Sequence, residues 1–357
     1  MITDHHNTPI HTMTQPHFLQ TLQRFNSNPL LTIDDITWDF KKKRSIMFPS
    51  VIDMSDKLDS PIDRYYMYLA SHGGREIGFA TAPTLEGPWT MQKEAVLHID
   101  NCPAVTGHLS SPEITYYNNR FILYYHGGCP PEVLEEQNRR MPTHYYQRIQ
   151  NSGAATSTDG IHFDVHPNNL LLPITTPDHW RAATNMYLRV VPTENGCHGF
   201  FMTMSREEAD YNGETKKLPK EQRAGRSHPT SIGHAYSPDG LNWILDETGA
   251  ILTAEEIYGE HQRIRHIGCT RIDDTHILAT YSCFSNTDAT CESIFAATLQ
   301  INDHAVSLVQ KHGTILTPQG EWEKQNVRDP FPIFHDKKLY LYYAGGGEKG
   351  IGLAISA

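Results

Sequence analysis

The chain has 357 residues, 38% of them hydrophobic, and a formal net charge of −11, a combination that fits one large globular domain. The acidic balance argues against a nucleic-acid partner, since the one basic run, at residues 41–44, is too short to reverse it. We expect no membrane partner because no run approaches the ~20 apolar residues of a membrane span. The first residues lack the apolar core of about 7 to 15 residues that a secretory signal needs, so we expect a cytoplasmic protein. Six cysteines without a CxxC pair are typical of reduced thiols.

The N-terminal region, residues 1–44, is expected to form an arm outside the main domain. Phe18, Leu19, Leu22 and Phe25 recur at helical spacing, which predicts one short helix. An apolar helix face is a surface on which a second copy of the chain can pack, so a homodimer through the arm is one hypothesis.

Residues 45–357 repeat one pattern five times. Each unit has an apolar run entered through a small or polar turn, then a Tyr-rich run, then a short run of small residues. A period of roughly 60 to 80 residues with three or four short alternating strands is typical of a radial β-architecture. We therefore predict an all-β fold, a five-bladed β-propeller with a short N-terminal helical arm. The last unit ends after its third strand, so residues 30–40 are expected to close the ring as a fourth strand. The units begin at Phe48, Ser111, Thr184, Ile267 and Asp329.

Two long insertions, residues 129–150 and 205–230, each interrupt the link between the second and third strands of a unit. Loops of this length in a compact domain are usually functional or disordered. Because successive strands alternate in direction, these links share one rim with the starts of the innermost strands, and we expect a site on the axis at that rim. The side chains expected there are those of Phe48, Glu113, Asn185, His266 and Asp329, with His72 and His126 just outside them.

Two entry turns resemble those of a known superfamily. Residues 328–345, which begin Arg-Asp-Pro-Phe-Pro, and residues 110–127, which begin Ser-Ser-Pro-Glu, resemble the blade openings of the five-bladed glycoside hydrolases of families 43, 32, 68 and 117. The resemblance implies the same propeller over residues 45–357 and a carbohydrate substrate. It places Asp329 where these enzymes carry an axial Asp, and Glu113 where they carry the Asp of the second blade.

The chain departs from the family 43 pattern in the other three blades. Phe48 stands where that family has the Asp of its first blade. The acid of the third blade is replaced by Thr184 or Asn185, and the chain has Arg265 or His266 in place of the Glu of the fourth blade. The chain is therefore not a standard member of family 43. Two interpretations remain: a hydrolase with a relocated carboxylate pair, or a propeller that has lost the reaction.

A relocated pair is chemically reasonable. Glycoside hydrolysis needs a proton donor and a second carboxylate, which inverting enzymes hold about 6.5 to 9.5 Å apart. The sequence favours an inverting mechanism, with Asp329 as the base and either Glu113 or Glu260 as the acid. His266 is a further acid candidate, because imidazole donates protons near neutral pH. The alternative is structural: an ion pair of Glu113 with a rim arginine, and a turn cap by Asp329.

Arginines at the starts of the innermost strands give the only hint of the substrate. A guanidinium pocket in an acidic protein suggests an anionic ligand, such as a uronate-bearing or sulfated oligosaccharide. Internal pairing of these arginines with the acids is the alternative. The residues expected to bind substrate are Arg181, Arg265, Arg328, His72, His108, His126, Asn185, Trp180 and Phe48.

No cofactor and no metal site is expected, because the 21 histidines show no HxH or HExxH spacing. A divalent ion held by converging histidines in the central pocket is the alternative. The predicted function is that of a glycoside hydrolase, in carbohydrate metabolism or polysaccharide degradation. The competing classes are a non-catalytic carbohydrate-binding propeller and a phosphorylase or transferase on the same scaffold.

Overall fold

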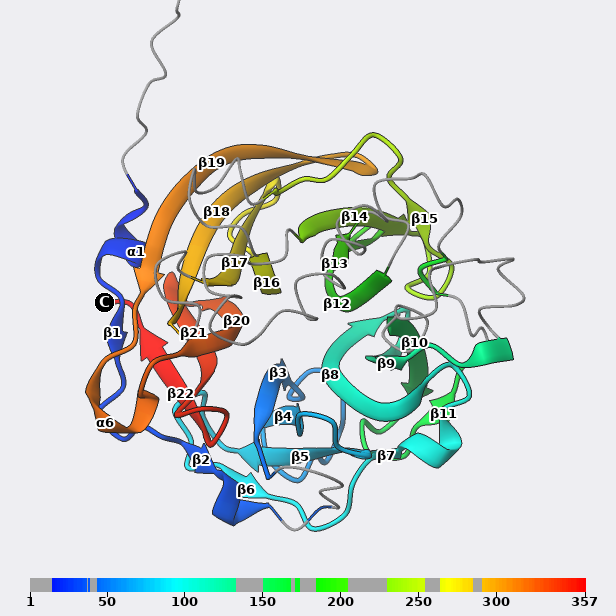
Figure 1. The fold of residues 1–357 in the computed structure, drawn as a ribbon, viewed down its shortest axis with the longest axis horizontal. Helices are drawn as coiled ribbons and strands as arrows, with labels where there is room; N and C mark the ends of the chain where they lie inside the picture. The colour runs from blue at the N-terminus through cyan, green and yellow to red at the C-terminus, as the bar shows by residue number, and fades with distance from the viewer. Residues whose placement is uncertain are drawn as a thin grey trace, which may run out of the picture.

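The computed structural model describes residues 15–36, 38, 44–132, 150–167, 171–173, 184–204, 230–253, 264–284 and 291–357. Five antiparallel sheets stand around one axis, which confirms the predicted five-bladed β-propeller (Figure 1). The innermost strand of each blade is the first strand of that blade in the chain, so the five entry turns face one another across the axis. No helix in this part of the chain combines the length and the hydrophobicity that crossing a membrane requires.

The strands run from the axis outward in each blade. Blade one has β3 (Met47–Asp53), β4 (Tyr65–Ala70), β5 (Glu76–Ala82) and β6 (Thr90–Met91), with β7 (Leu97–His98) also paired to β5. Blade two has β8 (Thr106–Tyr117), β9 (Arg120–Gly128), β10 (Gln150–Ser157) and β11 (Asp164–Val165). Blade three has β12 (Thr184–Thr193), β13 (Gly196–Met204), β14 (Ser231–Ser237) and β15 (Ile244–Leu245). Blade four has β16 (Ile264–Arg271), β17 (His276–Phe284), β18 (Glu292–Asn302) and β19 (Ala305–Leu316). Blade five has β20 (Val327–His335), β21 (Lys338–Gly345) and β22 (Gly350–Ile355).

Neighbouring blades are joined by a repeated contact between a tyrosine and an outer hairpin. Tyr68 on β4 donates its hydroxyl to the carbonyl of Gly160 at 2.5 Å, and Tyr124 on β9 donates to the carbonyl of Gly240 at 2.7 Å. Both glycines are left-handed, with φ of +74° and +78°, a conformation that glycine adopts without steric cost. The Asp-Gly hairpins are therefore joints between blades, and the Tyr-rich second strands supply their partners.

The N-terminal chain closes the ring beside β22 (Figure 1). Within the predicted segment, β2 (Leu31–Thr32) pairs with the start of β22, and β1 (Gln23–Arg24), which precedes that segment, pairs with its end. The outer edge of blade five is thus made of two short strands where the sequence suggested one. The helix α1 (His17–Gln20) buries Leu19 in an apolar cluster with Leu278 and Leu339 of blades four and five.

Short helical segments complete the described part of the chain. A 3₁₀ turn, η1 (Ile33–Asp35), follows β2, and its entry is fixed by Thr32 and Asp35, which cap each other's backbone. A second, η2 (Ile99–Asn101), leads from blade one to blade two, and α6 (Gly320–Glu323) leads from blade four to blade five.

Candidate functional site

The innermost strand of every blade bends at the same level. Phe48, Ser111, Tyr187, His266 and Asp329 have φ of +59°, +51°, +57°, +33° and +52°, and each lies where the pairing with the second strand shifts register. We call these five residues the axial ring. A left-handed backbone is costly for side chains of this size, and such strain gathers at functional sites. Its recurrence in all five blades marks the level at which the fold presents side chains to the axis.

Three members of the axial ring pack against one another. The Tyr187 ring lies 4.6 Å from the His266 ring and 5.9 Å from the Phe48 ring, measured between centroids, and Phe48 lies 5.4 Å from His266. Phe48 and His266 are buried, whereas Tyr187 is half-buried. The axis is therefore narrow and aromatic at this level.

His266 and Asp329 form the ionisable part of the ring. The distance from His266 Nδ1 to Asp329 Oδ1 is 2.6 Å, and both side chains are at most 1% exposed. Burial raises the pKa of Asp329, the Arg328 guanidinium opposes that rise, and the Glu348 carboxylate adds to it. The Asp329 carboxyl therefore holds its proton to a higher pH than an ordinary aspartate.

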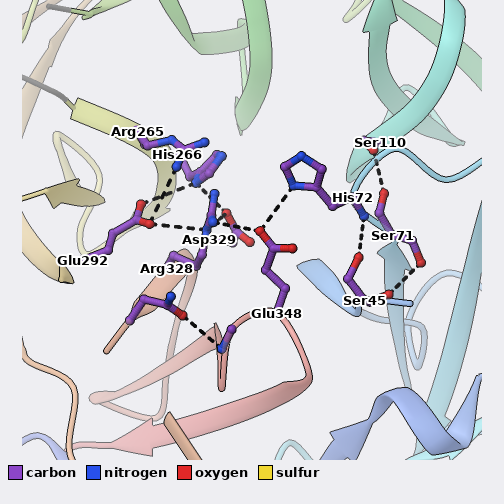
Figure 2. A network of polar contacts seen from close by, with 12 residues as sticks. Ser45, Ser71, His72, Ser110, Arg265, His266, Glu292, Arg328, Asp329 and Glu348 are labelled. Atoms are coloured by element: carbon purple, nitrogen blue, oxygen red, sulfur yellow. Dashed lines mark hydrogen bonds and ion pairs between the residues drawn. The ribbon is translucent and has the colours of Figure 1, made fainter. Parts of the chain in front are cut away.

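Arg328 connects Asp329 to two further carboxylates (Figure 2). Its Nη1 lies 3.0 Å from Glu348 Oε1, and its Nε lies 3.5 Å from Glu292 Oε2 and 3.7 Å from Asp329 Oδ1. These three acids raise the pKa of Arg328 against the effect of its burial, so the guanidinium stays charged. Arg265 also approaches Glu292, at 3.8 Å.

Glu292, the first residue of β18, is held as an ionised carboxylate. It is 1% exposed and accepts a hydrogen bond from the Ser282 hydroxyl at 2.7 Å. Burial acts to raise its pKa, but Arg328 and Arg265 outweigh burial and lower it. Glu292 and Glu348 were both missed in the sequence. The signal that the sequence offered was their position. Glu348 lies in the link between the second and third strands of its blade, and Glu292 lies at the end of such a link, on the rim where the site was expected.

His72 leads from the buried cluster to the surface. Its Nδ1 lies 3.3 Å from Glu348 Oε1, and its side chain is 55% exposed against 8% for Glu348. The backbone at His72 is fixed by serines, since its N–H donates to Ser45 Oγ at 2.7 Å and Ser71 Oγ donates to the Ser45 carbonyl at 2.6 Å (Figure 2).

A small pocket of about 40 Å³ opens beside this cluster. His72, His108 and His126 line it together with Phe48, Tyr187 and Arg328. Burial lowers the pKa of His126 well below its ordinary value, and His108, His266 and His72 lower it further, so His126 is neutral at neutral pH. The structure thus brings together five residues that the sequence analysis expected to bind substrate, and it adds Tyr187 to them. Within the described residues no group of three or more His, Cys, Asp or Glu is arranged to hold a metal ion.

Glu113 lies apart from this cluster, in a buried ion pair. Its Oε2 accepts hydrogen bonds from Arg189 Nη1 at 2.8 Å and Ser50 Oγ at 3.0 Å, and its Oε1 accepts one from the Val190 N–H at 3.1 Å. Ser111, two residues earlier, occupies the ring position of blade two. Burial raises the pKa of Glu113, and Arg189 is the main opposing influence. The contacts of Glu113 are those of the structural alternative, with Arg189 as the partner.

Asn185 also has a structural set of contacts. Its amide donates to the Leu172 carbonyl at 3.1 Å and accepts from the Thr203 hydroxyl at 2.8 Å, both inside blade three and its entry loop. Tyr187, two residues later, occupies the ring position. Three other residues expected at the site, Trp180, Arg181 and Glu260, lie outside the described residues.

Several buried polar atoms near the axial ring accept or donate no hydrogen bond within the described residues. A native protein rarely leaves such atoms unsatisfied, so a cluster of them marks a place where a polar ligand can bind. The set includes acceptors and donors together, which is what a polyhydroxylated molecule requires. The atoms are Asp329 Oδ2, Arg328 Nε and Nη2, Ser111 Oγ and His126 Nδ1.

Comparison with known proteins found one relative in sequence and several in fold. No model of a known protein family matches the chain. The uncharacterized protein R118 of Acanthamoeba polyphaga mimivirus is 24% identical over 361 residues, which cover 92% of this chain and 88% of that protein.

Solved structures share the fold at low identity. A thermostable family-43 glycoside hydrolase is 12% identical with a TM-score of 0.58, covering 87% of this chain and 88% of its own. The alpha-L-arabinofuranosidase from Lactobacillus brevis is 11% identical with a TM-score of 0.57, covering 91% of each chain. An N-acetylgalactosamine deacetylase from F. plautii is 12% identical with a TM-score of 0.58, covering 94% of this chain and 95% of its own. The chain is thus a five-bladed β-propeller of the kind found in glycoside hydrolases, and the fold resemblance seen in the sequence is confirmed.

Proposed function

We propose that this protein is a glycoside hydrolase that binds an oligosaccharide at the end of the propeller axis that carries the axial ring. In this proposal Asp329 is the central catalytic carboxyl group. The observation that carries the proposal is the state of Asp329: 0% exposed, left-handed, with Oδ1 2.6 Å from His266 Nδ1 and with Oδ2 receiving no hydrogen bond from the described residues. Buried carboxyl groups with perturbed pKa values and unused hydrogen-bonding capacity are typical of catalytic sites.

The raised pKa of Asp329 suits the proton donor of glycoside hydrolysis. This role is the acid, whereas the sequence favoured Asp329 as the base. Glu348 is then the second carboxylate, because Arg328 Nη1 donates a hydrogen bond to its Oε1 at 3.0 Å, whereas Arg328 Nε is 3.7 Å from Asp329 Oδ1. In an inverting reaction, which the sequence favoured, Glu348 activates the attacking water while Asp329 protonates the leaving oxygen.

His266 acts as the neighbour that orients Asp329 in this proposal. The short contact between Nδ1 and Oδ1 fixes the carboxyl group against the imidazole ring. Phe48 and Tyr187, which enclose His266, keep that side of the pair dry and strengthen its electrostatic interaction.

The charge balance of the cluster favours a neutral sugar. Arg265 and Arg328 face three carboxylates, those of Glu292, Asp329 and Glu348. The described cluster therefore has no surplus of positive charge to hold a uronate or a sulfate. This proposal departs from the anionic substrate that the arginine positions alone suggested.

A carbohydrate-binding propeller without catalysis is the second candidate. It is favoured by the axial ring itself, because Phe48, Ser111 and Tyr187 provide no acid in three of the five blades. Aromatic rings of this kind bind sugar faces without any acid–base chemistry.

The proposal is tested by a hydrolysis screen of the wild type beside Asp329→Asn and Glu348→Gln. Neutral, uronate-bearing and sulfated oligosaccharides are offered, with and without inorganic phosphate and a chelator. The matched control is Asp336→Asn, an exposed aspartate on the same blade. We expect turnover of a neutral glycan that falls about 10²- to 10⁴-fold in each site variant and stays unchanged in the control.

The other outcomes discriminate the alternatives. Binding of a glycan by all four proteins without turnover favours the carbohydrate-binding propeller. Turnover that requires phosphate identifies a phosphorylase, and turnover that the Asp329→Asn variant retains contradicts the catalytic role of Asp329.

A further inference from the structure

A second and larger cavity, of about 350 Å³, opens at the end of the axis opposite the axial ring. Its walls are the later halves of the innermost strands, such as Val51 of β3, Ile114 of β8 and Val190 of β12. The ring residues stand at the beginnings of the same strands. The cavity is therefore separate from the small pocket beside Arg328, and it belongs to no part of the proposed hydrolase site.

A buried plug divides the two ends of the axis. Arg189 is 1% exposed and donates to the Ile267 carbonyl at 3.0 Å and the Pro112 carbonyl at 2.7 Å, which joins blade three to blades two and four. Its guanidinium also lies 6.0 Å from the Phe331 ring centroid in blade five. Glu113, its ion-pair partner, forms part of the cavity wall.

About half of the residues that line the cavity are apolar, and the others are polar or charged. Val51, Ile114, Val190, Phe331 and Ile333 come from four different blades and enclose one space. A volume of this size lies at the small end of the range of about 300 to 1,000 Å³ typical of small-molecule pockets. An apolar body the size of a medium-length alkyl chain or a single aromatic ring fits such a space.

The charges around the cavity leave two cations for a ligand. The acids in the wall are committed, because Glu113 pairs with Arg189 and Asp53 accepts two hydrogen bonds from Arg64, at 3.0 and 2.8 Å. Lys57 and Arg271 also line the cavity. Both cations have partners at exposed positions: Lys57 pairs with Asp56, which is 78% exposed, and Arg271 donates long hydrogen bonds to Asp274 Oδ1 at 3.3 Å and to the carbonyls of Asp273 and Asp274 at 3.4 Å. Exposed pairs of this kind contribute little, so both cations remain available to an anion.

We propose that this cavity is a binding site for a small amphipathic carboxylate, whose apolar body lies among the valine, isoleucine and phenylalanine side chains and whose carboxylate meets Arg271, with Lys57 adding positive charge elsewhere in the wall. The site is independent of the proposed hydrolase activity.

The proposal is tested by calorimetric titration of the full chain with octanoate, octan-1-ol and octylammonium, which share one chain length and differ in charge. We expect saturable binding of one octanoate per chain, with octanol weaker by about tenfold and octylammonium weaker still. Arg271→Ala should weaken octanoate about five- to tenfold and leave octanol unchanged. Asp329→Asn, at the other end of the axis, is the control and should change neither.

Ile333→Trp should abolish binding by filling the cavity, since Ile333 is half-buried in its wall. If that variant does not fold, as judged by its circular dichroism spectrum, Ile52→Trp on the neighbouring blade serves the same purpose. The absence of saturable binding, equal affinity for octanoate and octylammonium, or binding that survives the cavity-filling substitution would each overturn the proposal.

Discussion

Glu323→Ala should open the ring closure of the propeller. Glu323 is 0% exposed and gathers four donors: Arg24 Nε at 2.7 Å, Arg24 Nη2 at 2.8 Å, the Gln319 N–H at 2.7 Å and the Tyr343 hydroxyl at 2.6 Å. Arg24 belongs to β1, so this carboxylate ties the N-terminal strand to α6 and β21. Its removal leaves a guanidinium and two polar groups without their acceptor.

The size of the effect follows from these contacts. Breaking a buried ion pair by removing one partner costs about 3 to 5 kcal/mol. The Arg24 side chain is 24% exposed, so water can solvate part of the orphaned charge, and we expect a loss of about 3 kcal/mol in the free energy of unfolding. For a chain of 357 residues such a loss lowers Tm by about 4 °C. Glu323→Gln should cost less, because its carbonyl oxygen can still accept from Tyr343.

Urea and thermal unfolding followed by circular dichroism measure this loss. A double-mutant cycle with Arg24→Ala isolates the ion pair from the other contacts of Glu323. Asp336→Asn is the control on the same blade and should unfold like the wild type, since Asp336 is exposed. A loss below about 1 kcal/mol in Glu323→Ala, or additive effects of the two single variants, would show that the ion pair between Glu323 and Arg24 does not stabilise the ring closure.

Two further predictions concern buried polar groups. Glu113→Gln should cost about 3 kcal/mol or more in the free energy of urea unfolding, because it leaves Arg189 buried without its counter-charge, while turnover per folded molecule stays unchanged; a stable but inactive variant would instead make Glu113 catalytic. The second concerns acid stability: burial lowers the pKa of both His198 and His234 to about 4, and their rings share a contact at 3.0 Å. The unfolded chain binds these protons first, so the stability present above about pH 6.5 should be lost as the pH falls toward 4. Unfolding midpoints measured across that range should drop in the wild type and drop less in His198→Gln; equal slopes would contradict the assignment.

The blade pattern was readable in the sequence because it depends on local order. Tyr68 and Tyr124 lie in Tyr-rich second strands. Each contacts the glycine of an outer hairpin, Gly160 for Tyr68 and Gly240 for Tyr124. A strand that must pack on both faces, followed by a tight turn, leaves the same signature wherever it occurs. Five such signatures predict five blades, and the structure contains them.

The site was only partly readable, because its register depends on backbone geometry. Asp329 was expected at the axis and lies in the axial ring, whereas Glu113 stands two residues beyond the ring position held by Ser111. A bulge places an extra residue in one strand and re-aims the side chains that follow. Neither Ser111 nor Tyr187 is a residue type that signals a left-handed backbone, so the sequence gives no sign of where each bulge falls.

The sequence by itself determined the fold class, the number of blades and the rim that carries the site, because each of these follows from hydrophobic alternation and turn residues a few positions apart. Only the tertiary structure decided which charges meet. Arg328 pairs with Glu292 from blade four and with Glu348 from the link between β21 and β22 of its own blade, and Glu113 pairs with Arg189 from the neighbouring blade. A buried charge requires a partner within a few ångströms, and which partner is that close depends on how the ring closes.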